Sequence, residues 1–188
     1  MSTPGWIIAG SWIVFLVFWY ANSLRVKKVA ERQSYAASLA YRIPIIIGGI
    51  LLFADRIRGP LSVRILPGTE AIKYGGALVC LAGVMVCIWA RVTLGGNWSS
   101  NVTFKQGHEL IRRGPYQFVR HPIYTGMLLM ILGTAMDQGF LRCFVGGLLM
   151  FIGFWIKLKE EEAVMLQHFP DQYPEYRRQV KALVPFVF

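Results

Sequence analysis

Charged residues are scarce in this sequence. Asp, Glu, Lys and Arg make up 16% of its 188 residues, against about 25% in an average soluble domain. Hydrophobic residues make up 55%, which is more apolar surface than so few charges can cover in water. This composition excludes an intrinsically disordered chain and argues against a water-soluble globule. We therefore expect an integral membrane protein.

Cysteine is also rare, and familiar cofactor motifs are missing. The three cysteines are an odd number, and each lies in an apolar run, which argues against a disulfide-stapled secreted module. The three histidines have no metal-ligand spacing, so we expect no metal ion. The sequence has neither a P-loop nor a GxGxxG motif after a strand, so the usual nucleotide-binding folds are not expected.

Acidic residues are half as frequent as basic ones. Ten Asp and Glu stand against 20 Lys and Arg, which gives a net charge of +10. In a soluble protein this excess would point to nucleic acid. In a membrane protein it is typical of cytoplasmic loops that face anionic lipid. We therefore expect anionic lipid, and no nucleic acid, as the partner of the basic segments.

Long apolar runs predict an all-α integral membrane protein with five transmembrane helices. About 20 apolar residues are enough for a helix to cross a bilayer. The predicted spans are 5–24, 35–54, 71–90, 123–136 and 140–156. Asp137-Gln138-Gly139 separates the last two and predicts a tight turn between antiparallel helices.

The basic residues predict the orientation of this bundle. Lys and Arg concentrate in three segments on the same side, 25–42, 91–120 and 157–188. The positive-inside rule therefore places the N-terminus outside and the C-terminus in the cytoplasm. We expect one domain, 1–188, in which 1–90 supplies three spans and 91–188 forms a catalytic, cofactor-binding region.

Polar and Gly-rich residues gather in two of the predicted cytoplasmic segments. The first, 107–126, reads GHELIRRGPYQFVRHPIYTG. His121-Pro122 directly precedes an apolar helix, whose first backbone N–H groups are available to an anion. Gly126 would let a ligand approach the backbone closely. An ordinary helix start with a capping histidine explains the same residues equally well.

The second segment, 157–186, is predicted to extend the fifth span, break near Pro170 and continue as a short basic helix. We expect this helix to be an interfacial anchor on anionic lipid, through Tyr173, Tyr176, Arg177, Arg178 and Lys181. The acidic pair Glu161-Glu162 has two interpretations. It is either part of a solvated helix face or a functional pair placed just below the membrane.

Five motifs in these segments occur in a specific order. They are a G-P-Y turn, R-H-P-x-Y-x-G, a distal E-E, F-x-x-x-Y-x-x-Y and a final V-P. The matching residues are Gly114-Pro115-Tyr116, Arg120-His121-Pro122-Ile123-Tyr124-Thr125-Gly126, Glu161-Glu162, Phe169 to Tyr176, and Val184-Pro185. With this combination the second half of the chain resembles the isoprenylcysteine carboxyl methyltransferase family and the related membrane phospholipid methyltransferases.

The resemblance implies an enzyme that methylates a lipid-like substrate with S-adenosylmethionine. It implies a cytoplasmic pocket formed by the loop before the fourth helix and the C-terminal extension of the fifth. The cofactor-binding residues that it implies are His108, Leu110, Ile111, Tyr116, His121, Tyr124, Gly126 and Glu162. The catalytic residues that it implies are Glu161, Glu162 and Lys157, where Lys157 replaces an Arg that the family associates with the substrate carboxylate.

Several functions remain open from the sequence. Carboxyl O-methylation of a prenylcysteine-type acceptor is the first expectation, and phospholipid N-methylation is the alternative. In either case the partner is a membrane lipid or a lipidated small substrate. Outside this class, a non-enzymatic membrane module or an NADPH-dependent membrane reductase would also contain apolar spans.

Overall fold

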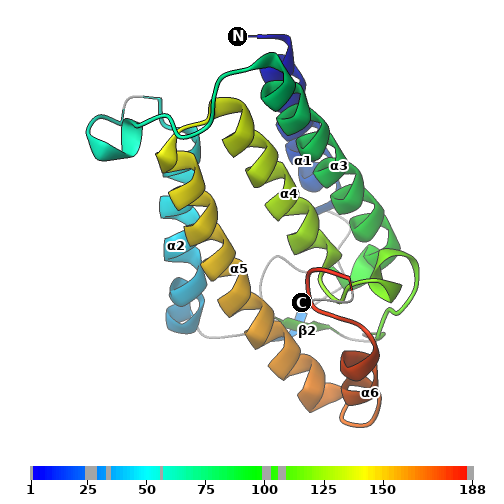
Figure 1. Cartoon of the computed structure of the whole chain (residues 1–188). Helices are drawn as coiled ribbons and strands as arrows, with labels where there is room; N and C mark the ends of the chain where they lie inside the picture. The colour runs from blue at the N-terminus through cyan, green and yellow to red at the C-terminus, as the bar shows by residue number, and fades with distance from the viewer. Residues whose placement is uncertain are drawn as a thin grey trace.

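A computed structural model describes residues 2–23, 29–32, 35–55, 57–98, 103–105 and 109–185, with backbone alone at 29–32, 35–37 and 103–105. Five long helices form a bundle (Figure 1). They are α1 Thr3–Ser23, α2 Tyr35–Phe53, α3 Glu70–Leu94, α4 Pro122–Gln138 and α5 Leu141–His168. The shorter elements are β1 Val29–Arg32, η1 Pro60–Ser62, η2 Gly95–Asn97, β2 Thr103–Lys105, η3 Gly114–Gln117 and α6 Gln172–Gln179.

The helical architecture agrees with the sequence prediction. The second helix begins at Tyr35 as expected, and Gly139 ends α4 with a φ of 72°, which makes the tight turn into α5. The fifth helix continues well beyond its predicted span, to His168, and α6 follows after the break near Pro170. A feature that the helical prediction did not include is the short antiparallel pairing of β1 with β2.

Within the described part of the chain, three helices are long and apolar enough to cross a membrane. These candidate spans are Thr3–Ser23, Glu70–Asn97 and Leu141–His168, and Ser38–Phe53 is a shorter apolar helix. Many large apolar side chains on the helices are exposed, including Ile13, Leu78 and Leu148. An apolar outer surface on spans of this length is what lipid contact requires. The chain is therefore an integral membrane protein.

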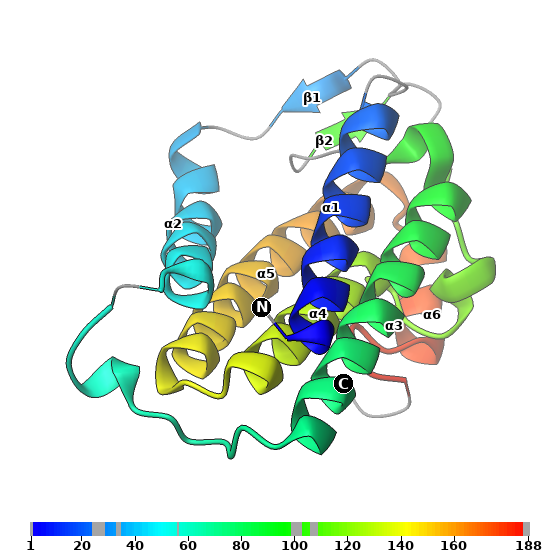
Figure 2. The same cartoon turned by 90° about the horizontal axis from the view of Figure 1, so that it is seen from above.

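The helices pack mainly as two close pairs, α3 with α4 and α2 with α5 (Figure 2). Glycines bring α3 and α4 together: Gly76 meets Gly133, and Gly83 meets Gly126. In both helices the two glycines lie seven residues apart, about two turns, so they share one face. Small residues in such positions let two backbones approach closely, and this contact is a main source of helix association in membranes.

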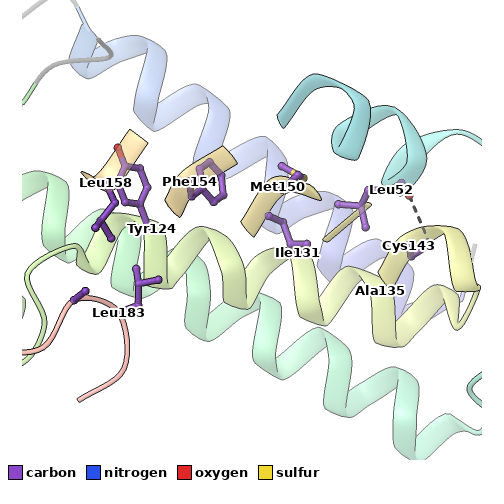
Figure 3. Close-up of a cluster of buried hydrophobic side chains, with 10 residues drawn as sticks. Leu52, Tyr124, Ile131, Ala135, Cys143, Met150, Phe154, Leu158 and Leu183 are labelled. Carbon is purple, nitrogen blue, oxygen red and sulfur yellow. Dashed lines mark hydrogen bonds between the residues drawn. The ribbon is translucent and has the colours of Figure 1, made fainter. Parts of the chain in front are cut away.

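Glycines also allow the close approach of α2 and α5. A Cβ added at Gly146 would lie 2.6 Å from the carbonyl oxygen of Gly48, and one at Gly153 would lie 2.7 Å from that of Tyr41. Beside this contact, a cluster of buried apolar residues follows α5 along the bundle (Figure 3). It includes Leu52, Tyr124, Ile131, Met150, Phe154 and Leu158.

An alanine at Gly133 should weaken the α3–α4 contact. Its Cβ would lie 2.3 Å from the carbonyl oxygen of Gly76, so the helices must separate, at a cost of about 1–3 kcal/mol in unfolding free energy. Thermal unfolding of the purified protein in detergent measures this loss. Gly10→Ala and Gly49→Ala are matched controls, because nothing lies within 4 Å of an added Cβ there. Equal melting temperatures in all three variants would contradict the contact.

One end of the bundle gathers α6, η3 and the C-terminal segment (Figure 1). The backbone N–H groups of Arg120 and His121 donate to the carbonyls of Lys181 and Ala182, at 2.8 and 3.0 Å. The hydroxyl of Thr125 donates to the carbonyl of Leu183 at 2.7 Å. These bonds hold the loop before α4 against residues more than 50 positions later, and so bring the two polar segments together.

Candidate functional site

A cavity of about 290 Å³ lies between the loop before α4 and the C-terminal half of α5. This is close to the lower end of the roughly 300–1,000 Å³ range of small-molecule sites. Its lining residues are Trp19, Leu94, Asn97, Trp98, Glu109, Leu110, Ile111, Tyr116, Arg120, His121, Ile123, Tyr124, Met127, Phe154, Lys157, Glu161, Val164, Met165, Tyr173 and Tyr176. The two polar segments of the sequence therefore share one hollow.

His121 connects the two segments. It is the residue directly before α4, and its Nδ1 lies 3.6 Å from Glu161 Oε2 while its Nε2 lies 3.4 Å from Glu162 Oε1. Burial alone lowers the pKa of His121, but hydrogen bonds and charges from the two glutamates outweigh it and raise this pKa above its ordinary value. The histidine is therefore held as a bridge between two acids.

Glu161 faces the cavity. Its Oε1 accepts a hydrogen bond of 2.6 Å from the Tyr124 hydroxyl and lies 3.9 Å from Lys157 Nζ. The Tyr124 ring stacks between those of His121 and Phe154, with centroid distances of 5.6 and 5.3 Å. Lys157 and Glu161 are four residues apart on α5, so they lie on the same helix face. The cavity wall thus carries a carboxylate, an ammonium group and an aromatic stack side by side.

Glu162 lies behind this wall. It is only 2% exposed, and its Oε1 accepts hydrogen bonds from Arg120 Nε at 2.8 Å and Nη2 at 2.5 Å. Arg120 also donates to the carbonyls of Arg177 and Val180, at the C-terminal end of α6. Glu162 therefore fixes Arg120, His121 and α6 in place from outside the cavity.

Tyrosines close the side of the cavity next to α6. Tyr176 donates to the carbonyl of Tyr116 at 2.5 Å, and Arg112 donates to the carbonyl of Gln172 at 2.6 Å. Burial raises the pKa of Tyr116, Tyr173 and Tyr176, so these phenols stay protonated at neutral pH. Tyr173 and Tyr176 of the helix expected to anchor on lipid are buried, at 3% and 4% exposure, so any contact of this helix with anionic lipid would come from its exposed basic residues and stays a prediction.

The structure brings most of the predicted site residues together. Those on the cavity wall are Leu110, Ile111, Tyr116, His121, Tyr124, Lys157 and Glu161. Gly126 instead lies at the α3–α4 contact, where an added Cβ would be 2.6 Å from Cys87 Sγ and from the Gly83 carbonyl oxygen. Its packing explains the need for glycine there. His108 lies outside the described residues.

Sequence reasoning missed one wall of the cavity. Trp19 comes from α1, and Asn97 and Trp98 follow α3. The rings of Trp19 and Trp98 meet edge to face at 5.4 Å, and the Arg91 guanidinium lies 4.6 Å from the centre of the Trp98 ring. A Gly-Gly-Asn-Trp run directly after an apolar span was the available signal, since tryptophan is uncommon in an ordinary polar loop. Within the described part of the chain, no three His, Cys, Asp or Glu side chains gather as a metal site.

Comparisons with known proteins show which chains this one is similar to. Residues 76–167 match the isoprenylcysteine carboxyl methyltransferase family. Protein-S-isoprenylcysteine O-methyltransferase of Schizosaccharomyces pombe is 34% identical over 101 residues, or 52% of this chain and 43% of that protein. The Tribolium castaneum protein of that name is 26% identical over 196 residues, 96% of this chain and 66% of its own length.

Two further matches extend over most of the chain. A probable protein-S-isoprenylcysteine O-methyltransferase of Oryza sativa subsp. indica is 29% identical over 97% of this chain and 96% of that protein. The solved structure of a eukaryotic intramembrane Ras methyltransferase, ICMT, aligns with a TM-score of 0.52 and 21% identity, over 84% of this chain and 55% of that one. This likeness supports the fold. The chain spans less than two thirds of the length of the Schizosaccharomyces and Tribolium relatives.

Proposed function

Because residues 76–167 match the isoprenylcysteine carboxyl methyltransferase family, we propose that this chain is a methyltransferase that uses S-adenosylmethionine. We propose that its acceptor is the carboxylate of a prenylcysteine-type lipid. The observation that carries the proposal is the cavity itself, whose wall combines Glu161 and Lys157 with aromatic and apolar side chains. Such a site accommodates a cation, an anion and an apolar tail together.

The residues present fit the proposed donor. S-adenosylmethionine, when bound, supplies a methyl group on a positively charged sulfur. Glu161 and the ring of Tyr116 attract a cation, and a cation–π contact contributes about 0.5–2 kcal/mol. Tyr124, whose ring is stacked between His121 and Phe154, would contribute by holding Glu161 in place. Leu110 and Ile111 add apolar wall. Glu162 would support donor binding indirectly by fixing His121, and Gly126 would do so by keeping α4 close to α3. A role of His108 in donor binding stays a prediction.

The same cavity also carries groups that fit the proposed acceptor. The ammonium group of Lys157, whose side chain is 14% exposed, offers an ion pair to a carboxylate. Trp19, Met127 and Phe154 form an apolar wall for a prenyl chain. Because the wall is largely apolar, it excludes water and leaves the carboxylate less solvated than in bulk. Holding two reactants in line in this way can lower a barrier by about 7–11 kcal/mol.

The arrangement in the membrane completes the proposal. We propose that all five long helices span the bilayer, with the N-terminus outside and the cavity and C-terminus in the cytoplasm. In this single domain, 1–90 supplies three spans and 91–188 the donor-binding and catalytic residues. Arg177, Arg178 and Lys181 are exposed beside the cavity, where they can meet anionic lipid.

The test of this function is methyl transfer by the purified protein in detergent. We expect radiolabelled S-adenosylmethionine to yield the base-labile methyl ester of N-acetyl-S-farnesylcysteine. Lys157→Met should reduce acceptor use at least about tenfold, because a hydrogen bond to a charged group is worth roughly 1.5–3 kcal/mol. Lys159→Met is the matched control, because Lys159 is exposed and packs over Trp155 instead.

Three results would contradict the proposal. One is binding of S-adenosylhomocysteine without formation of any ester, which would support the proposed donor and contradict the proposed acceptor. Another is methyl transfer to the amine of an ethanolamine lipid alone, which would favour N-methylation. The third is binding of NADPH in place of S-adenosylhomocysteine, which would point to a reductase.

A further inference from the structure

Tyr41 on α2 is a buried phenol outside the part of the chain that matches the family, which begins at residue 76. Its exposure is 3%. Its hydroxyl has no hydrogen-bond partner within the described part of the chain. Buried hydroxyl groups almost always have a partner, so an unpartnered one needs an explanation.

Packing holds Tyr41 next to Lys157, which lines the cavity, although Tyr41 itself is not part of the lining. Gly153, one turn before Lys157 on α5, lets the backbone of α2 approach, since an added Cβ would lie 2.7 Å from the Tyr41 carbonyl oxygen. The ammonium nitrogen of Lys157 lies 5.6 Å from the centre of the Tyr41 ring and 5.7 Å from that of Tyr124. The cation on the cavity wall is therefore held between two tyrosine rings.

The two tyrosines differ in what their hydroxyl groups do. That of Tyr124 is already used, because it donates to Glu161 at 2.6 Å. That of Tyr41 has no acceptor among the described residues. A phenol O–H and an ammonium group both present hydrogen atoms, so next to each other they suit the lone pairs of an anion. They disfavour a substrate amine or ammonium group in the same place.

We propose that Tyr41 is a specificity-determining residue that donates a hydrogen bond to the carboxylate of the methyl acceptor, while Lys157 forms the ion pair with it. This inference rests on the proposed function, and it adds a residue from α2 to a site otherwise assigned to 91–188. Tyr41 and Lys157 together select an acid over an ester, an amide or an amine. The Tyr41 ring also limits the positions open to the Lys157 ammonium.

Tyr41→Phe tests the hydroxyl alone, because phenylalanine keeps the ring beside Lys157. We expect the KM for N-acetyl-S-farnesylcysteine to rise about tenfold, as for loss of a hydrogen bond to a charged group. Binding of S-adenosylhomocysteine should stay unchanged. A second assay compares this acid with its carboxamide, each as an inhibitor of methyl transfer to a second prenylcysteine acid. The wild type should bind the acid more tightly than the carboxamide. Tyr41→Phe should reduce the ratio of the two affinities about tenfold. A change in packing alone would weaken both inhibitors equally.

Tyr74→Phe is the matched control, because Tyr74 is 45% exposed on α3. This variant should leave the KM, the binding of S-adenosylhomocysteine and the acid-to-carboxamide ratio unchanged. In a Lys157→Met background, Tyr41→Phe should raise the KM by a smaller factor than it does in the wild type, because the Tyr41 hydroxyl and the Lys157 ammonium hold the same anion. A wild-type KM and acid-to-carboxamide ratio in Tyr41→Phe would overturn this inference and leave the proposed function intact. A wild type that forms no methyl ester would overturn both.

Discussion

The variant Glu162→Ala is expected to lose about 3–5 kcal/mol of unfolding free energy, because removing one partner of a buried ion pair leaves the other charge uncompensated. The Arg120 side chain is 8% exposed, and without Glu162 its guanidinium keeps the backbone carbonyls of Arg177 and Val180 as acceptors but loses its carboxylate partner. His121 loses one of its two glutamates at the same time. Thermal unfolding in detergent should show a melting temperature lower by roughly 10 °C or more, and methyl transfer should fall with it.

Glu70→Ala is the control for this loss. Glu70 forms an ion pair with Lys73 at 2.8 Å, but its side chain is 65% exposed. Pairs of this kind contribute about 0–1 kcal/mol, so the melting temperature should change little. If Glu162→Ala unfolds at the temperature of Glu70→Ala, then Glu162 does not hold Arg120 and α6 in the way described.

The variant Glu161→Gln is expected to keep its fold and lose methyl transfer by a factor of roughly 10–100. Its carboxylate accepts from Tyr124 and lies next to Lys157 and His121. A neutral amide keeps the shape, but it weakens these contacts and removes the negative charge that faces a cationic donor. The side chain is 27% exposed, so the unfolding free energy should change far less than in Glu162→Ala. Steady-state kinetics and melting temperature together measure the two effects.

Glu160→Gln is the matched control, because Glu160 precedes Glu161 on the same helix and lies outside the cavity lining. It should retain activity close to that of the wild type. Equal losses in the two variants would mean that the total charge of the acidic run matters, rather than the position of Glu161. An unimpaired Glu161→Gln would remove Glu161 from the site.

Much of the fold was predictable, because its signals are local. Long apolar runs predict helices, because a helix satisfies its own backbone hydrogen bonds within an apolar environment, and these runs located the five long helices of the described chain. Gly139 marked the turn between α4 and α5, and Pro170 the break before α6. The family resemblance that the motifs carry also implied that the segments around His121 and Glu161 belong to one site.

The roles of individual residues within that site were less predictable. Glu161 and Glu162 are adjacent in sequence, yet one faces the cavity and the other forms a buried ion pair. Gly126 belongs to a helix contact, although it follows the motif closely. Trp19 and Tyr41 come from the first two helices, where no motif drew attention to them.

Apolar length and turn chemistry are properties of a few neighbouring residues, so they are present in the chain before it folds. The direction in which a side chain points is not determined before folding. Consecutive helix residues point about 100° apart, and the rotation of α5 against α2 and α4 depends on which glycines meet. That packing turns Glu161 toward the cavity and Glu162 toward Arg120. It also brings Tyr41 to Lys157 across more than 100 residues of chain.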